Sequence, residues 1–203
     1  IQKGQKVVNI AVNKAIPVLG IRTQATQAFM GQSGIAPQID YQGAINTANF
    51  SNSVTTLTLD VKDKQTQQKI GRLQVPLFAG AEYSFKGHGY DHEIVGKTYM
   101  SGNNAGNAFY GGLGKDGQTI GSDVQNRVRA LDSEYLAHYD EQGSSYDYNA
   151  PTMNNFSDKT YSFSAYYGAG IEANSVIEIA LDAPSGVDAI VWKASLPVTV
   201  TYA

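Results

Sequence analysis

The sequence contains no cysteine, which excludes a disulfide framework, thiolate metal ligands and a cysteine nucleophile. Charge is also scarce, since Asp, Glu, Lys and Arg make up 16% of the 203 residues and the formal net charge is −3. Such a chain offers no basic face for phosphate groups, so no nucleic-acid partner is expected. No apolar run approaches the roughly 18 residues that a membrane-spanning helix requires.

Hydrophobic residues make up 42% of the chain, which is enough for a substantial core. Glycine (21 residues) and tyrosine (13 residues) are abundant, and Asn, Ser, Thr and Gln supply much of the remaining polarity. A surface of this kind suits an exported protein that packs against copies of itself. The length favours one β-rich domain, or one sandwich that carries a large insertion.

Apolar and polar residues alternate in the first part of the chain, as in half-buried strands. Residues 8–12 place apolar side chains on one face, and residues 16–21 form a short apolar run. Residues 57–61 show the clearest alternation, and residues 73–77 repeat it after a polar loop. The last two segments therefore predict an antiparallel pair.

The last part of the chain returns to this period of two, in residues 161–165, 177–181 and 196–202. Pro197 has no N–H to donate, so the final strand is expected to have one side unpaired or paired irregularly. A long apolar strand at an open edge invites association with another chain. The side chains that share its apolar face are Leu196, Val198, Val200 and Tyr202.

Residues 82–160 read differently and are predicted to form an insertion within a single domain of residues 1–203. One stretch has apolar side chains at helical spacing: Val124, Val128, Leu131, Tyr135 and Tyr139. Ser122 and Gln125 resemble a capping box, and Asp132 could restart the helix. One or two short helices are therefore expected, and long loops are predicted for the rest of the insertion.

Residues 88–93 (HGYDHE) hold the one cluster of potential metal ligands, which are His88, Asp91, His92 and Glu93. The alternative is a solvated polar loop, which is favoured because the zinc-binding HExxH pattern is absent. A nucleophile elbow, a phosphate-binding loop and a dinucleotide fingerprint are also missing. The sequence therefore predicts no metal, no cofactor and no enzymatic activity.

Several runs resemble the K88 (F4)-type fimbrial subunits, a family that includes the F41 and CS31A subunits. Residues 14–23 (KAIPVLGIRT) and 34–39 (GIAPQI) are similar to a "PILLGRT…GIPQI" run of that family. Further matches follow in the same order along the chain: residues 71–77 (GRLQVPL), 108–113 (AFYGGL), 164–170 (SAYYGAG) and 192–202 (WKASLPVTVTY).

The resemblance implies an all-β fold: an incomplete immunoglobulin-like sandwich that lacks its final strand. A periplasmic chaperone first supplies this strand, and the N-terminal extension of the next subunit then replaces it, which is donor-strand complementation. Leu196, Val198, Val200 and Tyr202 would border the acceptor groove. Family members carry a donor extension ahead of their first strand, and the printed sequence starts a few residues before Val8.

In the K88 family the major subunit is itself the adhesin, and its galactose-type sugar site lies in the corresponding insertion. Aromatic rings stack on the apolar face of sugars while amides and carboxylates bind the hydroxyl groups. The alternative is that the aromatic residues pin long loops to the sandwich. The candidate sugar-binding residues in this sequence are Phe109, Tyr110, Tyr146, Tyr148 and Phe156.

The favoured function is therefore a fimbrial subunit on the bacterial surface that mediates adhesion to host cells. The expected partners are neighbouring subunits, a periplasmic chaperone, an outer-membrane usher and host glycoconjugates. A minor or structural subunit without a receptor is one alternative. A secreted sugar-binding module and a glycosidase are the others.

Overall fold

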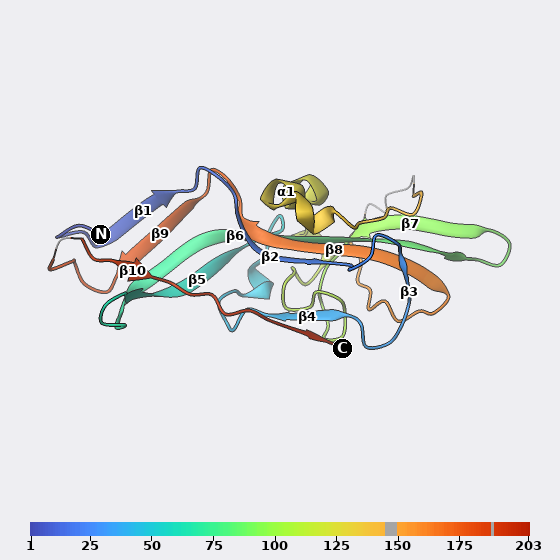
Figure 1. Ribbon diagram of the computed structural model, residues 1–203, viewed down its shortest axis with the longest axis horizontal. Helices are drawn as coiled ribbons and strands as arrows, with labels where there is room; N and C mark the ends of the chain where they lie inside the picture. Colours follow the sequence, from blue (N-terminus) through green and yellow to red (C-terminus); the bar gives the residue numbers. More distant parts are fainter. Residues whose placement is uncertain (145–149, 188) are drawn as a thin grey trace.

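The structure is a computed structural model that describes residues 1–144, 150–187 and 189–203 (Figure 1). Antiparallel strands dominate it, and the described part contains one short α-helix, which confirms the predicted all-β class. Nine strands form one strongly curled sheet, and β4 and β11 form a second, two-stranded sheet. The curled sheet and the small sheet enclose the core of an immunoglobulin-like domain.

The strands are β1 (Val7–Ala11), β2 (Ile16–Arg22), β3 (Phe29–Met30), β4 (Pro37–Asp40), β5 (Val54–Asp63), β6 (Lys69–His88), β7 (Glu93–Tyr99), β8 (Tyr161–Ile171), β9 (Val176–Leu181), β10 (Trp192–Lys193) and β11 (Thr199–Tyr202). The helix is α1 (Val124–Leu131), and the short 3-10 helices are η1 (Thr47–Asn49), η2 (Gly117–Thr119) and η3 (Ser133–Leu136). The strands expected near residues 8–12, 16–21, 161–165 and 177–181 are confirmed.

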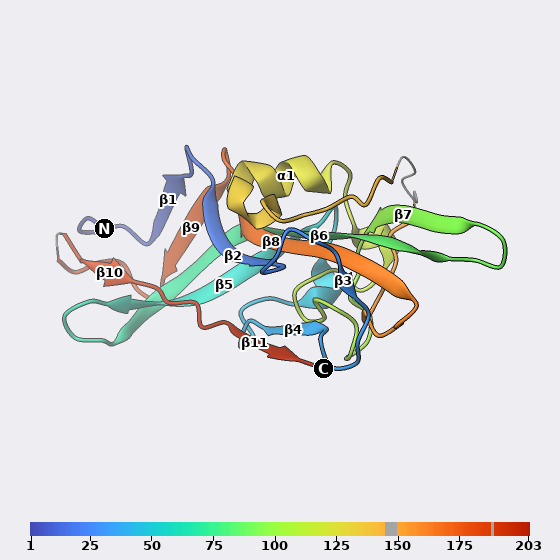
Figure 2. The ribbon, with the colours of Figure 1, turned by 45° about the vertical axis from the view of Figure 1, so that its right-hand side comes forward.

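The long strand β6 organises the fold, because its two halves pair with different neighbours. Its first half lies between β5 and β9, and its second half lies between β7 and β8. Leu57 faces Val75 and Leu59 faces Leu73, which confirms the predicted antiparallel pair. Figures 1 and 2 show β6 running through the middle of the molecule and ending in the β6–β7 hairpin.

Long loops were the wrong prediction for residues 82–99, which form the end of β6 and the strand β7. The alternation of exposed and buried residues stops at Leu77, and every residue from there to Ser84 is buried. This part of β6 is covered on one face by the core and on the other by α1. A strand that is buried on both faces loses its period of two, which explains the error for residues 82–84.

The helix α1 lies on the outer face of the sheet, above β6 and β8 (Figure 2). A row of three glycines makes room for it, because Gly168 of β8 faces Gly20 of β2 on one side and Gly80 of β6 on the other. A Cβ atom at Gly80 would lie 2.5 Å from Val124, and one at Gly168 would lie 2.5 Å from Val128. Because these three glycine positions carry no side chain, the helix lies close to the sheet.

The expected capping box at Ser122 is absent. The N-cap is Asp123, which has a left-handed backbone (φ 58°) and makes no side-chain capping hydrogen bond. The expected restart at Asp132 is confirmed, because its side chain accepts a hydrogen bond from the Glu134 amide at the start of η3. The second of the two short helices is thus a 3-10 helix.

Candidate functional site

The C-terminal segment, residues 192–202, is the clearest candidate for a functional site. Half-buried and exposed residues alternate strictly from Trp192 to Val200. The half-buried ones are all apolar, and four of the five pack against the main core: Trp192, Ala194, Leu196 and Val198, with Val200 as the fifth. None of them is fully buried, although they point inward. The apolar side of this segment is therefore only partly covered.

The backbone of the C-terminal segment is also only partly paired. β10 pairs with β5, and β11 pairs with β4 along one edge. Between them, residues 194–198 make no backbone hydrogen bond to any residue that the structure describes. Pro197 contributes to this gap because it has no N–H, as expected from the sequence. The other edge of β11 has no partner strand in the described ranges.

Strand β2 borders the same opening from the other side. It pairs with β8 along one edge, with a bulge between Pro17 and Leu19, and with no second strand in the part of the chain described. Its inward side chains Val18, Leu19 and Ile21 pack on the main core but remain half-buried. Figure 2 shows β2 and the C-terminal segment on the two sides of β5. Two free strand edges thus flank one incompletely covered core.

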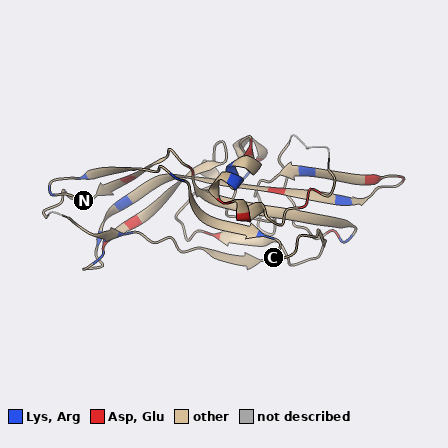
Figure 3. Cartoon of the chain, turned by 45° about the horizontal axis from the view of Figure 1, so that its top comes forward, with Lys and Arg blue, Asp and Glu red and all other residues tan. Residues whose placement is uncertain are grey.

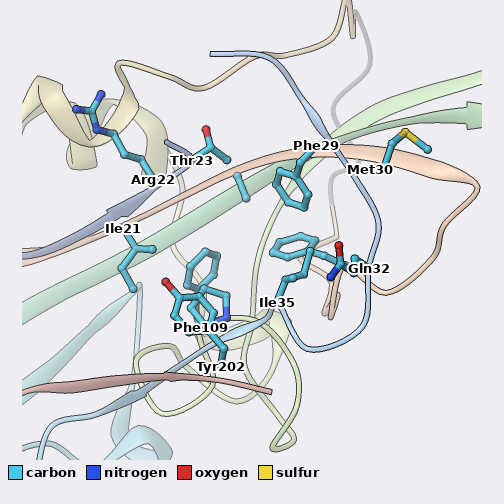
Figure 4. Close-up of a pocket in the computed structure, with 12 residues that line it drawn as sticks. Ile21, Arg22, Thr23, Phe29, Met30, Gln32, Ile35, Phe109 and Tyr202 are labelled. Carbon is cyan, nitrogen blue, oxygen red and sulfur yellow. The ribbon is translucent and has the colours of Figure 1, made fainter. Parts of the chain in front are cut away.

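A cavity of about 300 Å³ lies at one end of this opening, where β2 and β11 both contribute to its wall. Figure 4 shows Ile21, Phe29, Ile35 and Tyr202 around a common space. Tyr202 belongs to β11 and is 66% exposed. We call this cavity the Ile21–Tyr202 pocket. Its predominantly apolar lining is suited to a large apolar side chain rather than to a charged group.

Charge is almost absent along the opening. β11 carries none, and Arg22 is the single charged residue of β2. The Arg22 guanidinium points away from the pocket in Figure 4 and forms an exposed ion pair with Glu134 at 3.5 Å. Figure 3 shows charged residues on β5, β6, β7 and α1, while the strand that ends at the C-terminus is uncharged. Exposed Lys193 is the one charged residue of the C-terminal segment, so the opening is predominantly apolar and carries little charge.

Three of the residues predicted to bind sugar are described by the structure, and they differ in burial. Phe109 and Phe156 are buried, with 2% of each residue exposed, and their ring centroids lie 6.5 Å apart. The ring of Phe109 also stacks on Tyr167, at 5.4 Å between centroids. Tyr110 is 36% exposed, and Tyr146 and Tyr148 lie outside the described residues. The two phenylalanines belong to the core, which is the alternative considered from the sequence.

Phe109 and Phe156 nevertheless line the Ile21–Tyr202 pocket. These residues and Tyr202 were predicted to belong to two different sites, and the structure brings them together in one. Ile21, Phe29 and Ile35 were not predicted as site residues, although Ile21 and Ile35 lie within two of the runs that resemble the K88 family. Phe29 carries no comparable signal.

The potential metal ligands of residues 88–93 lie at the exposed tip of the β6–β7 hairpin. His92 Nδ1 is 2.6 Å from Asp91 Oδ1, and both side chains are largely exposed. Within the described ranges, no three His, Cys, Asp or Glu residues are grouped so that they could hold a metal ion. No described helix is long and apolar enough to cross a membrane.

An immunoglobulin-like domain with an incompletely paired C-terminal segment is consistent with the fimbrial class of subunit. The chain belongs to the K88 family of fimbrial proteins: a family model described as "Fimbrial, major and minor subunit" matches residues 1–203. The chain is also similar to the F41 fimbrial protein of Escherichia coli, with 26% identity over 191 residues. That match covers 86% of this chain and 67% of the relative. Membership of this family implies a pilus on the cell surface.

Proposed function

We propose that this chain is a fimbrial subunit that accepts a strand from another polypeptide along its open edge. The periplasmic chaperone supplies the strand first, and a neighbouring subunit replaces it at the outer-membrane usher. The assembled fimbria then mediates adhesion of bacteria to host cells through glycans. The observation that carries the assembly proposal is the C-terminal segment, with its half-buried apolar side chains and unpaired backbone.

An added strand would pair the free backbone of this segment and cover its apolar side chains. Its backbone would pair with the free edges of β11 and β2, and its alternate side chains would cover the half-buried core. Burial of each large apolar side chain contributes about 1.5–3 kcal/mol, while fixing the backbone of each residue costs about 1–2 kcal/mol. The expected ligand is therefore an extended strand in which every second residue is apolar and covers the apolar side of the C-terminal segment.

The Ile21–Tyr202 pocket would set the register of the added strand. Ile21 of β2 and Tyr202 of β11 both line it, and Phe109 and Phe156 contribute to its apolar wall. A large aliphatic or aromatic side chain at one position of the strand would enter it. The remaining inward positions would then face Leu196 and Val198 in sequence.

The test is to supply the strand within the same chain. A flexible linker and a strand of alternating valine and threonine are fused after Ala203, and the melting temperature is compared with that of the unfused chain. In a domain of this size each kcal/mol shifts the melting temperature by about 2–4 °C, so a net gain of about 3 kcal/mol predicts a rise of roughly 6–12 °C.

The matched control carries the same fusion with aspartate at every inward-facing position of the added strand. Desolvation of these charges prevents insertion, so no rise is expected. If the unfused chain is monomeric and melts at the same high temperature as the fusion, the sandwich is already complete and strand acceptance is refuted. If both fusions raise the melting temperature equally, the effect does not come from an inserted strand.

A further inference from the structure

A second, smaller pocket lies at the start of β8, apart from the Ile21–Tyr202 pocket. Its volume is about 200 Å³. Aromatic side chains of β6 and β8 form one part of its wall, and the loop that precedes β8 forms the other. The lining residues are Tyr83, Phe85, Asn154, Asp158, Tyr161 and Phe163. It therefore combines aromatic rings with two polar side chains.

Tyr161 is held flat against the sheet by a glycine. Gly87 of β6 is its cross-strand partner, and a Cβ atom there would lie 2.5 and 2.6 Å from Cδ1 and Cε1 of the Tyr161 ring. Phe85 supports this ring at 6.2 Å and Phe163 supports it at 6.3 Å between centroids. Tyr161 is half-buried and lines the pocket. Its ring is thus a fixed platform, with one face packed over Gly87.

Asp158 provides a hydrogen-bond acceptor beside this platform. Its Oδ1 atom accepts hydrogen bonds from the Thr160 amide at 2.9 Å and the Thr160 hydroxyl at 2.6 Å. Both hydrogen bonds lower the pKa of the Asp158 carboxyl below its ordinary value, and the one from the hydroxyl has the larger effect. The carboxylate therefore stays ionised at neutral pH. Its Oδ2 atom makes no hydrogen bond to the residues that the structure describes.

Asn154 provides a donor on the same loop. Its Oδ1 atom accepts a hydrogen bond from the Phe156 amide at 2.6 Å, which fixes the orientation of the side chain. Its Nδ2 atom donates no hydrogen bond to a residue that the structure describes, so both of its hydrogens are available to a ligand. Both polar residues therefore use one atom to shape the loop and keep another for a ligand.

From this arrangement we infer that the pocket binds a single sugar ring, with the apolar C–H face of the ring on Tyr161. Asp158 Oδ2 accepts from a sugar hydroxyl and Asn154 Nδ2 donates to a second one. A phosphate group is disfavoured by the carboxylate, and a purely apolar ligand would leave both polar atoms unpaired. This inference rests on the adhesion part of the proposed function, and it assigns that role to residues other than Phe109, Tyr110 and Phe156.

The test uses the complete 203-residue chain on an array of neoglycoconjugates that carry galactose, N-acetylgalactosamine, glucose, mannose, fucose and sialic acid. Saturation-transfer NMR with the free methyl glycoside of the best-bound sugar follows. Tyr161→Ala and Asp158→Asn are each expected to reduce the array signal at least tenfold. Asp158→Asn keeps the Oδ1 acceptor for Thr160, so the loop is preserved and a folding defect is not expected.

Tyr90 is fully exposed and lies outside the pocket, so Tyr90→Ala is the control and should bind as the wild type does. Tyr110→Ala tests the other candidate position. If sugar binding survives both Tyr161→Ala and Asp158→Asn, or if it is lost in Tyr110→Ala alone, the pocket is not the sugar site while glycan adhesion stands. If the folded wild-type chain binds no sugar on the array and in NMR, this inference and the glycan part of the proposed function both fail.

Discussion

The hydroxyl groups of Tyr41 and Tyr167 lie 2.8 Å apart in the core, and Tyr167 donates onward to the Gly112 carbonyl at 3.0 Å. Tyr41 is therefore the donor to Tyr167. This chain of hydrogen bonds joins the segment after β4, the strand β8 and the loop that carries Phe109. Burial raises the pKa of Tyr41 to about 12 and raises the pKa of Tyr167 well above its ordinary value.

These pKa shifts predict a loss of stability in alkali. Below pH 10 both phenols are neutral in the folded and the unfolded chain, so the full stability is present. Between pH 10 and about 12 the unfolded chain releases protons that folded Tyr41 retains, which lowers the free energy of unfolding by about 1.4 kcal/mol per pH unit. Tyr41→Phe removes this contribution and should flatten the decline by that amount.

The measurement is urea unfolding at pH 8, 10.5 and 11. At pH 8, Tyr41→Phe should cost about 1 kcal/mol, because one buried hydrogen bond is lost. Tyr90→Phe is the control, since Tyr90 is fully exposed and its substitution should change neither value. An unaltered pH dependence in Tyr41→Phe would show that Tyr41 titrates as an exposed phenol.

Phe109 and Tyr110 are adjacent in sequence, yet their substitution should change the free energy of unfolding by very different amounts. Phe109→Ala removes a ring that stacks on Tyr167 and is expected to lower the free energy of unfolding by about 3–5 kcal/mol. Tyr110→Ala should cost less than about 1 kcal/mol, because the side chain is exposed. The measurement is chemical unfolding at pH 7. Phe109→Leu keeps most of the buried volume and serves if Phe109→Ala does not fold. Equal costs at the two positions would contradict the burial described.

Charges on the C-terminal segment should act according to the face on which they lie. In the chain fused to an added strand, Val198→Asp and Val200→Asp should abolish the rise in melting temperature, because both side chains face the strip that the strand covers. Thr199→Asp is the matched control on the exposed face and should keep most of the rise. A similar loss in all three variants would show that charge on either face is enough to prevent insertion.

The glycine row beneath α1 gives a prediction about packing. A Cβ atom at Gly168 would lie 2.5 Å from Val128 Cγ1 and 3.0 Å from Tyr135 Cδ2, so Gly168→Ala should cost about 1–3 kcal/mol in urea unfolding. Gly186→Ala is the control, since no atom lies within 4 Å of a Cβ atom there. Val128→Ala should recover part of the loss in Gly168→Ala, and strictly additive costs would argue against the contact.

The sequence predicted well those strands that have one face in water. Leu57 and Leu73 lie on such strands, and the alternation of burial is visible in the residue types. The same reasoning failed for residues 77–84, where both faces are buried, and for Ser122, because the chain turns at Asp123 with a positive φ of 58°.

The candidate sites were less accessible than the strands. Phe109 also has a positive φ of 62°, which cannot be read from composition. At this turn the ring of Phe109 is buried, while the neighbouring side chain of Tyr110 is exposed. The platform at Tyr161 depends on Gly87, and this partnership is set by the register of β6 and β8. Contacts that depend on strand register cannot be predicted from the spacing of residues along the chain.

The positions of Gly20, Gly168 and Gly80 are expected to covary with the residues that face them. Each position fits a side chain of the helical region: Gly20 lies against Tyr135, Gly80 against Val124, and Gly168 against Val128. A relative that gains a methyl group at one of these glycines can keep the helix in place only if the facing side chain becomes smaller. In an alignment of many family members, these three pairs are therefore expected to change together, while their neighbours along the strands vary independently.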